Sequence, residues 1–383
     1  MSQATVVVGA TWGDEGKGRV VDYLAQSADF SIRFQGGANA GHTVINEHGE
    51  FALHQMPSGV FNPQCTGVLG PGMVINPFEL ANEVAHLANK GVQANFCISN
   101  RATLCLPLHV EQDCLEEMRL GDMAYGSTRQ GIAPAYGDRV MKKGILAGWL
   151  NEPDVLRDQL QMWMDWKLPQ LQALYPSASF GRSANALCEQ LLEVSQSWRH
   201  HITDVTPLLR QALSTGQSMV FEAQLGSGRD LYYGEYPYTT SSSTLAGHAG
   251  LGGGIPELRD LKVIAVAKVY SSSVGTGTLP TAMDDGGAFR EKTQEYGVTT
   301  GRPREVGHFD APATRMGILA HGTTEVALTK LDCLGGEPEL KVAVAYEGRK
   351  AMDNPIWPAR ASLKPVYRSL PGWQEDISDC RQY

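Results

Sequence analysis

A glycine-rich loop near the N-terminus contains a lysine and two carboxylates; its sequence is Trp12-Gly13-Asp14-Glu15-Gly16-Lys17-Gly18. Backbone N–H groups of such a turn, together with the start of a following helix, bind anions, and a lysine contacts phosphate as a point charge. The standard phosphate loop has Ser or Thr after its lysine, whereas Gly18 stands here. A carboxylate beside phosphates is costly unless it binds a metal or removes a proton. Asp14 is therefore a candidate for either role, the alternative being that it only caps the following helix.

A second glycine-rich loop has the sequence Gly36-Gly37-Ala38-Asn39-Ala40-Gly41-His42-Thr43. A histidine near neutral pH can donate a hydrogen bond to a phosphoryl group in transfer, which makes His42 a candidate for that role. A lone histidine after a turn is more often structural. The functional interpretation gains support because this loop follows the next strand and is expected at the same sheet edge as the first loop.

Two further segments carry donors and acceptors suited to nucleotides and carboxylates. Thr329-Lys330-Leu331-Asp332 follows a strand, and its aspartate can accept both N1–H and N2–H of guanine, a donor pair that adenine lacks. Val298-Thr299-Thr300-Gly301-Arg302-Pro303-Arg304 places two hydroxyls and two guanidinium groups on one loop, an arrangement that binds carboxylate or phosphate. The alternative for that loop is a solvated basic turn. A hydroxyl-rich turn over residues 236–244 suits phosphate oxygens.

The elements that must position these loops alternate between strands and helices. Short apolar runs predict strands at residues 5–9, 30–34, 218–221, 262–269, 325–328 and 341–346, with a further strand pair at 68–70 and 73–75. Helical spacing predicts helices at residues 19–28 and 78–90, and residues 151–213 form the most helical region, whose leucine stripe is core. The fold class is therefore α/β, with a large, mostly parallel central sheet flanked by helices. We expect one domain over residues 1–383 with a helical insertion at about 151–213.

Composition excludes several classes of protein. The net charge of −9 argues against broad nucleic-acid binding. The sequence contains no run of about 18 apolar residues, so we expect no membrane span. The chain is expected to begin with a strand rather than a signal peptide. The seven cysteines lack a CxxC pair, so we expect reduced thiols in a cytoplasmic protein.

Taken together, these segments resemble the adenylosuccinate synthetase family. The matching stretches occur in the family's order along nearly the whole chain: WGDEGKG at 12–18, QGGANAGHT at 35–43, LHQMPSG at 53–59, GSTRQGIAPAYGDR at 126–139, YPYTTSSST at 236–244, VTTGRPR at 298–304, LTKLDCL at 328–334 and LPGWQEDI at 370–377. The resemblance implies a phosphate-loop-like GTP-binding fold. It also implies a two-step reaction in which GTP phosphorylates the 6-oxygen of IMP and the amine of L-aspartate then displaces that phosphate.

The resemblance also implies roles for individual residues, including a homodimer in which Lys142 reaches the partner's nucleotide site. The catalytic residues implied are Asp14, His42 and Gln224. The GTP-binding residues implied are Gly13, Asp14, Glu15, Gly16, Lys17, Gly41, His42, Thr43, Lys330 and Asp332, with Asp14 and Gly41 as ligands of Mg²⁺. The acceptor nucleotide is matched by Asn39, Thr128, Lys142, Gln224, Leu225, Thr240 and Arg302, and aspartate by Val298, Thr299, Thr300, Arg302 and Arg304.

The chain departs from the family pattern at the purine and guanine sites. The family has Glu-Gly-Ala-Gln-Gly-Thr where this chain has Glu222-Ala223-Gln224-Leu225-Gly226-Ser227, so Leu225 occupies the position of the purine-contacting glutamine unless the loop shifts by one residue. Gln130, Arg139 and Lys142 replace Arg, Lys and Arg. The chain stops at Tyr383, whereas family members continue with a Ser-x-Gly-Pro segment that closes over guanine.

Three functions remain open at this point. The first is the GTP-dependent ligase acting on IMP. The second keeps the chemistry with another acceptor, such as GMP, dGMP or a specialised metabolite. The third is a catalytically weak nucleotide-binding regulatory paralogue, which the joint presence of Asp14, Lys17, His42 and Arg302 disfavours.

Overall fold

A computed structural model describes residues 4–273, 277, 279–297, 301–349, 363–377 and 380. Its centre is an eight-stranded sheet in the order β15-β11-β1-β10-β2-β5-β7-β9, in which every pairing is parallel. The strands are β1 (Ala4–Gly9), β2 (Phe30–Arg33), β5 (Thr66–Leu69), β7 (Phe96–Ser99), β9 (Ile202–Thr203), β10 (Met219–Glu222), β11 (Lys262–Lys268) and β15 (Glu325–Thr329). The predicted α/β class with a mostly parallel sheet is confirmed.

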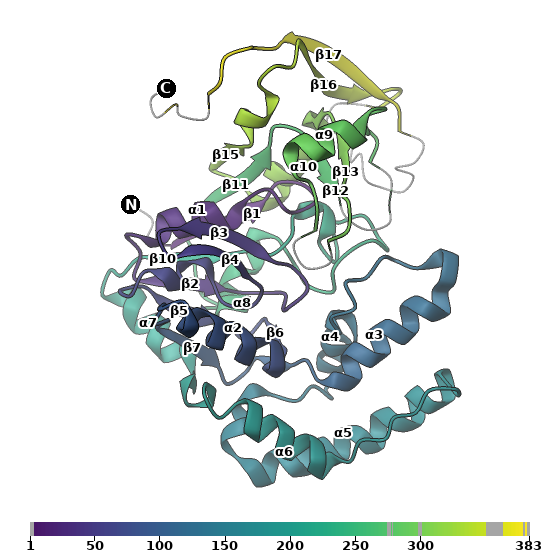
Figure 1. Ribbon diagram of the computed structural model, residues 1–383. Helices are drawn as coiled ribbons and strands as arrows, with labels where there is room; N and C mark the ends of the chain where they lie inside the picture. Colours follow the sequence, from purple (N-terminus) through teal and green to yellow (C-terminus); the bar gives the residue numbers. More distant parts are fainter. Residues whose placement is uncertain are drawn as a thin grey trace.

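Helices cover both faces of this sheet (Figure 1). They are α1 (Lys17–Ala25), α2 (Pro77–Asn89), α3 (Pro107–Leu120), α4 (Ile132–Val140), α5 (Pro153–Leu174), α6 (Ala184–Val194), α7 (Val205–Ser214), α8 (Ala249–Gly253), α9 (Gly286–Thr293) and α10 (Ala311–His321). Successive side chains of a strand point to opposite faces. Val7 accordingly packs in the cluster that contains Val21 of α1, while Val6 and Val8 pack in the cluster that contains Leu209 of α7. Burial on both faces explains why β1 is a continuous apolar run.

Residues 151–213 hold α5, α6 and α7, as their helical spacing predicts, and also β9, which pairs with β7 at the edge of the sheet. Helices α5 and α6 lie beside each other at the end of the molecule opposite the C-terminal strands (Figure 1). Trp163 and Trp198 are fully buried in the core cluster that joins them to α2 and β7. Helix α5 of this part lines one side of the cavity described below.

The remaining strands form small sheets. They are β3 (His42–Asn46) with β4 (Gly49–Leu53), β6 (Val74–Ile75) with β8 (Thr103–Leu104), β12 (Ser271–Ser273) with β13 (Glu305–Gly307), and β14 (Phe309–Asp310) with β16 (Glu339–Tyr346) and β17 (Pro365–Pro371). The predicted strand at 341–346 is therefore confirmed, but it lies outside the central sheet. The predicted pairing of 68–70 with 73–75 is wrong, because β5 belongs to the central sheet and β6 pairs with β8.

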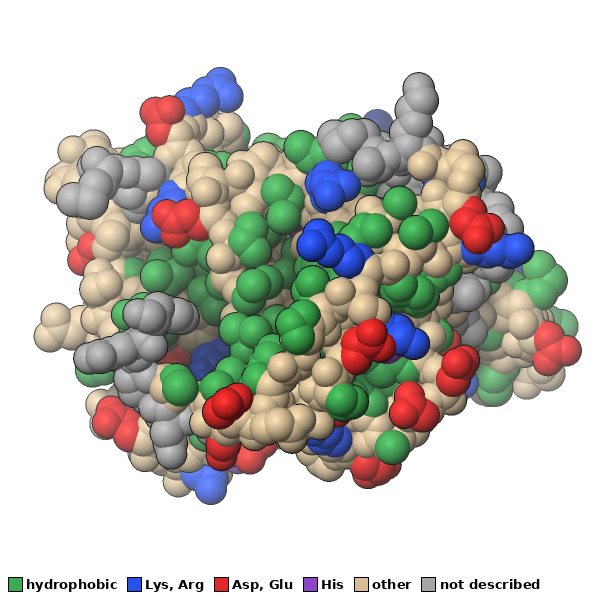
Figure 2. Space-filling model, turned by 90° about the horizontal axis from the view of Figure 1, so that it is seen from above, with side chains coloured by type: hydrophobic (Ala, Val, Ile, Leu, Met, Phe, Trp, Pro, Cys, Tyr) green, Lys and Arg blue, Asp and Glu red, His purple; other side chains and the backbone are tan. Residues whose placement is uncertain are grey.

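Strand β15 lies at one edge of the central sheet, and its apolar residues are only partly covered. Val326 is 46% exposed and Leu328 is 53% exposed, whereas the core strand β10 is buried along its whole length. Seen from the end of the molecule that carries β16 and β17, hydrophobic side chains lie between charged ones across the surface (Figure 2). Among the described residues, no helix combines the length and hydrophobicity that a membrane span requires.

The parallel sheet brings five strand ends to one edge. β1, β2, β10, β11 and β15 end at Gly9, Arg33, Glu222, Lys268 and Thr329, and the loops after β1, β2, β10 and β15 carry candidate residues. Ligands of open parallel sheets bind at the carboxyl ends of the strands, where the chain direction places adjacent loops side by side. A ligand site is therefore expected at this edge of the sheet.

Candidate active site

The first glycine-rich loop joins β1 to α1 through three residues in left-handed backbone conformations. Gly13, Asp14 and Gly16 have φ of 104°, 60° and 92°. Asp14 tolerates this conformation better than most residues because its short polar side chain can bond locally. Gly16 is the N-cap residue of α1, and no side chain caps this helix. The alternative role of Asp14 as the helix cap is therefore wrong, and its carboxylate, 31% exposed, faces a cavity.

Glu15 folds back into the same loop. Its Oε1 accepts hydrogen bonds from the backbone N–H of Gly13 at 2.8 Å and of Thr11 at 3.2 Å, and its Oε2 accepts one from Lys17 Nζ at 2.8 Å. Glu15 and Lys17 are both buried. An incoming phosphate therefore competes with the Glu15 carboxylate for the lysine and the loop N–H groups, which are the donors that an anion needs.

His42 pairs with a carboxylate that the sequence did not single out. Its Nδ1 is hydrogen-bonded to Glu222 Oε1, and Glu222 also accepts from Ser58 N and Ser58 Oγ, both at 2.7 Å. Burial raises the pKa of Glu222, but His42, Arg33 and Ser58 outweigh it and lower that pKa to about 2. Because an ionised carboxylate only accepts, the hydrogen sits on His42 Nδ1 and Nε2 is left for another partner. Burial is the largest influence on the pKa of His42 and lowers it, while the Glu222 carboxylate acts to raise it.

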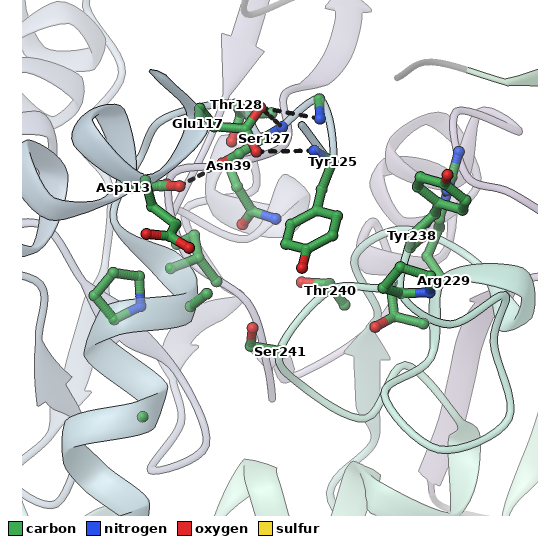
Figure 3. Close-up of a pocket in the computed structure, with 18 of the residues that line it drawn as sticks. Asn39, Asp113, Glu117, Tyr125, Ser127, Thr128, Arg229, Tyr238, Thr240 and Ser241 are labelled. Atoms are coloured by element: carbon green, nitrogen blue, oxygen red, sulfur yellow. Dashed lines mark hydrogen bonds between the residues drawn. The ribbon is translucent and has the colours of Figure 1, made fainter. Parts of the chain in front are cut away.

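One cavity of about 700 Å³ lies beside these loops (Figure 3). Such a volume suits a nucleotide-sized ligand. Eight of the residues selected from the sequence line it: Asp14, Asn39, Gly41, Thr128, Leu225, Thr240, Arg302 and Arg304. Asn39 and Thr240 come from different strand ends, yet their side chains face the same space in Figure 3. The structure thus brings together polar groups separated by more than 200 residues of sequence.

Two arginines form one side of the cavity. Arg304 Nε lies 3.0 Å from Asp14 Oδ2, and Arg302 Nη2 donates to the carbonyl of Gly126 at 3.1 Å. Val298, Thr299 and Thr300, selected from the same loop, lie outside the described residues. A guanidinium group beside an open cavity is suited to a carboxylate ligand.

The loop that presents Thr128 is anchored by two carboxylates of α3. Glu117 accepts from the backbone N–H groups of residues 125, 126 and 127 at 3.0–3.1 Å. Asp113 accepts from Ser127 Oγ at 2.8 Å and from Gly131 N at 2.9 Å. Figure 3 shows both carboxylates beside Ser127 and Thr128. The N–H groups of residues 125–127 are therefore occupied within the protein, and the loop presents Thr128 to the cavity.

The candidate guanine-binding residues lie outside this cavity, next to the phosphate loop. Thr329 Oγ1 donates to the carbonyl of Glu15 at 2.7 Å, which fixes the end of β15 against that loop. Lys330 follows with φ of 66° and donates through Nζ to the carbonyl of Thr293 at 3.4 Å. Asp332 is exposed. The residues predicted to contact the guanine base and those predicted to contact the phosphates are therefore neighbours in space.

Comparisons with known proteins agree with the motifs. The family profile described as adenylosuccinate synthetase matches residues 6–383. The chain belongs to the adenylosuccinate synthetase family. It is similar to adenylosuccinate synthetase 2 of Pseudoalteromonas translucida, with 60% identity over 99% of this chain and 90% of that protein. It is 39% identical to adenylosuccinate synthetase of Lactococcus lactis subsp. cremoris, over 99% of this chain and 89% of that protein.

Solved structures give the same fold. The chain is similar to fully ligated adenylosuccinate synthetase from Plasmodium falciparum, with a TM-score of 0.89, 31% identity and coverage of 99% of this chain and 90% of that one. Succinoaminodeoxyadenylate synthetase of cyanophage S-2L has a TM-score of 0.64 at 21% identity, over 87% of each chain, which shows a likeness of fold alone.

Within this adenylosuccinate synthetase fold, Leu225 lines the cavity and Gln224 does not. Leu225 has φ of 62°, and Gln224 is fully buried. The Gln224 amide instead holds the second glycine-rich loop: Nε2 donates to the carbonyl of Gly37 at 2.7 Å, and Oε1 accepts from Gly37 N at 3.1 Å. Gln224 Oε1 lies only 1.7 Å from where a Cβ on Gly36 would stand, which explains the glycine there. The loop is therefore not shifted so as to present Gln224 to the cavity.

Other residues carried over from the family lie elsewhere on the surface. Lys142 is exposed after α4, with φ of 64°, and does not line this chain's own cavity. Thr43 is exposed on β3. Their roles stay predictions.

Sequence patterns missed several cavity-wall and supporting residues. Arg229 is buried in the cavity wall, where it donates to the carbonyl of Tyr238 at 2.6 Å and to Ser273 Oγ at 2.7 Å. Glu222 and Lys268 are charged residues that end otherwise apolar strands. A charged residue at the carboxyl end of a buried strand was the available signal, because burying a charge is costly unless it is paired.

Proposed function

We propose that this chain is a GTP-dependent ligase that joins L-aspartate to the 6-position of a 6-oxopurine nucleotide, with IMP as the acceptor and adenylosuccinate, GDP and phosphate as products. The observation that carries the proposal is the single cavity in which the Asp14 carboxylate, two arginines and the polar side chains of Asn39, Thr128 and Thr240 meet. Membership of the adenylosuccinate synthetase family supports the same reaction.

In the first step, Asp14 removes the proton from N1 of the purine. The electron pair moves to O6, which attacks the γ-phosphorus of GTP; a P–O bond forms and GDP leaves. Lys17 and the loop N–H groups hold the phosphates, and a protonated His42 donates from Nε2 to the phosphoryl group while Glu222 accepts from Nδ1 and fixes the ring. Positioning and charge stabilisation supply most of the catalysis of phosphoryl transfer.

In the second step, the amine of aspartate attacks C6 and phosphate leaves with the former 6-oxygen. Arg302 and Arg304 bind the aspartate carboxylates, since a guanidinium group pairs with a carboxylate through two parallel hydrogen bonds. Val298, Thr299 and Thr300 complete that subsite in the proposal. Asn39, Thr128 and Thr240 bind the acceptor's phosphate.

The donor nucleotide is GTP, with Lys330 covering the base and Asp332 accepting its two N–H donors. Magnesium is the expected metal. Among the described residues, no group of three or more His, Cys, Asp or Glu side chains could hold a metal ion by itself. The Asp14 carboxylate and the Gly41 carbonyl border one cavity, and such a sparse oxygen set fits Mg²⁺, which is usually bound through one or two carboxylates plus phosphates. When bound, the ion neutralises phosphate charge.

The acceptor is the least constrained part of the proposal because Leu225 cannot hydrogen-bond a purine. IMP is the default, and GMP, dGMP or a specialised metabolite are the alternatives. A catalytically weak regulatory paralogue is disfavoured because the sequence keeps Asp14, Lys17, His42 and Arg302 together.

A homodimer is part of the proposal. Lys142 would reach the partner's nucleotide site, and its neighbours Val140 and Met141 are largely exposed apolar residues, as interface residues are. We also propose a cytoplasmic location: Cys65, Cys97, Cys105 and Cys188 are buried free thiols, which suits a reducing compartment.

The test is a panel of IMP, GMP and dGMP with GTP and aspartate, reading GDP release and the mass of the adduct. IMP should give aspartate-dependent GDP release and an adduct with the mass of adenylosuccinate. Turnover with GMP or dGMP alone would select the second acceptor class, and nucleotide binding without any turnover would select the regulatory paralogue.

A further inference from the structure

A buried chain of alternating charges lies behind Asp14, and two of its four members, Lys268 and Glu295, have no role in the proposed reaction. It runs from Lys268 at the end of β11, through Glu295 after α9, to Arg304 before β13 and then Asp14. The side chains of Lys268, Glu295 and Arg304 are 4%, 1% and 9% exposed, against 31% for Asp14. The chain therefore opens to the cavity at the Asp14 end.

Glu295 is the centre of this chain. Its Oε1 accepts from Lys268 Nζ at 2.7 Å and from the hydroxyl of Tyr270, and its Oε2 accepts from Arg304 Nη1 at 2.7 Å. Lys268 Nζ also donates to Ser272 Oγ at 2.6 Å. Burial works against the charge of Glu295, but Lys268 and Arg304 lower its pKa to about 2. The carboxylate is thus ionised and fully used by three donors.

Arg304 is held at one end and available at the other. Its Nη1 is bound by Glu295, while its Nε lies 3.0 Å from Asp14 Oδ2. Within the described residues, this buried Nε makes no hydrogen bond. An unsatisfied buried N–H at the wall of a cavity is a site for an incoming acceptor, because leaving it unpaired costs about 1–3 kcal/mol.

Holding an arginine in one orientation needs such an anchor. A free arginine side chain loses about 2 kcal/mol of rotamer entropy when it is fixed. Because Glu295 already fixes the Arg304 guanidinium in the empty site, this entropy is lost on folding and not on substrate binding. Lys268 and Tyr270 hold Glu295 in place. Burying an ion pair costs desolvation energy, so the pair between Glu295 and Arg304 is by itself weak evidence of a stabilising role. A role in substrate binding explains the pair better.

We propose that Glu295 is a positioning residue for the aspartate subsite: it orients the Arg304 guanidinium so that this group contacts a carboxylate of the substrate and stays beside Asp14. The inference rests on the proposed function, because it assigns the carboxylate ligand of Arg304 to aspartate. Glu295 itself does not face the cavity.

The test compares Glu295→Gln with Glu291→Gln, an exposed glutamate of α9. Glutamine keeps the shape of Glu295 and one acceptor but removes the charge, and a hydrogen bond to a charged group is stronger than one to a neutral group. We expect the aspartate KM to rise at least tenfold in Glu295→Gln, with the KM values of GTP and IMP and the kcat within about threefold, and no change in Glu291→Gln.

Tyr270→Phe is a second variant in case Glu295→Gln folds poorly. It removes one donor to Glu295 and keeps the ring against Phe289. We expect a smaller, several-fold rise in the aspartate KM. An unchanged aspartate KM in both variants, or equal rises for all three substrates, would overturn the inference.

A binding measurement separates this inference from the proposed function. Succinate has both carboxylates of aspartate but no amine, so calorimetric titration of the GDP- and IMP-loaded protein measures the subsite without turnover. Weaker succinate binding in Glu295→Gln supports the inference even if the chain makes no adenylosuccinate. Turnover in the wild type with succinate affinity unaffected by Glu295→Gln would remove the inference and leave the proposed function standing.

Discussion

Asp14 is the residue on which the chemistry depends. It sits in a left-handed turn between Gly13 and Glu15, faces the cavity, and lies beside the Arg304 guanidinium. In the proposed mechanism its position explains why a carboxylate interrupts an anion-binding loop: the one side chain would accept the purine N1 proton and bind the Mg²⁺ beside the phosphates. Glu15, the other carboxylate of the loop, has a different role, because its oxygens are bound within the loop.

Asp14→Asn tests this role with little disturbance of the backbone, since asparagine also adopts the left-handed conformation readily. Loss of a general base reduces the rate by about 10²–10⁴-fold, and loss of a metal contact adds to that. We expect kcat with IMP to fall by at least that factor while the melting temperature stays near that of the wild type. Steady-state kinetics with calorimetry checks both, and an Asp14→Asn enzyme with wild-type turnover would refute the mechanism.

Asp332 decides the donor nucleotide in the proposal. Its carboxylate matches the two N–H donors of guanine, whereas an amide matches one donor and one acceptor. Asp332→Asn should therefore weaken GTP and favour xanthosine triphosphate, whose C2 oxygen replaces the amino group. Initial rates with GTP, ATP and xanthosine triphosphate measure this preference. Equal rates with ATP and GTP in the wild type would contradict the assignment.

At the scale of elements, the loops depend on one another more than on their own sequences. Gln224, after β10, holds Gly37 in the loop after β2, and Thr329, the last residue of β15, holds the carbonyl of Glu15 in the loop after β1. Parallel strands make such contacts possible because their carboxyl ends are adjacent. A sequence motif shows which residues are present, but the choice between Gln224 and Leu225 as the cavity residue required the structure.

Gln224→Leu should therefore act on the loop rather than on the acceptor directly. It leaves Gly37 N and the Gly37 carbonyl without their partner, and an unpaired buried group costs about 1–3 kcal/mol. We expect a lower free energy of unfolding, measured by chemical denaturation, with Gln217→Leu, an exposed position before β10, as the control. Full stability combined with a tenfold loss of IMP affinity would instead show that Gln224 contacts the acceptor.

The sequence predicted six of the eight strands of the central sheet and missed β7, although β7 is buried along its whole length. β1, β10 and β11 are largely apolar runs. Each of the glycine-rich loops after β1 and β2 carries its candidate residues within one short stretch of sequence. β9 has only two residues and could not be recognised by periodicity, and β16 has the pattern of a strand without any sign of which sheet it joins. The charged chain from Lys268 to Asp14 could not be predicted from the sequence, because its members come close together only after folding.

At the scale of the whole molecule, buried ion pairs hold the site together, so the free energy of unfolding should depend on pH. Glu295 has a pKa of about 2, against an ordinary value of 4.5, owing to Lys268 and Arg304, which outweigh burial. A carboxyl group with a depressed pKa in the folded state contributes stability that is complete above the ordinary pKa and is lost as the pH falls towards about 2.

The expected contribution of Glu295 is about 3 kcal/mol at neutral pH, since one pKa unit corresponds to about 1.4 kcal/mol. Glu295→Gln should therefore be less stable than the wild type at pH 7, and the difference should shrink between pH 4.5 and pH 2. Denaturant titrations across this range measure the difference, with Glu291→Gln as the control. A difference that is constant with pH would show that Glu295 is not held as an ionised group.

The central claim is that phosphate leaves the purine carrying its former 6-oxygen, because Asp14 has made O6 the nucleophile towards GTP. IMP labelled with oxygen-18 at O6, incubated with GTP, aspartate and the unmodified protein, tests this claim most directly. Mass spectrometry of the released phosphate should find one labelled oxygen for each adenylosuccinate formed. Unlabelled phosphate with the label in water would contradict the 6-phosphoryl intermediate, and the absence of aspartate-dependent GDP release with any purine monophosphate would contradict the ligase itself.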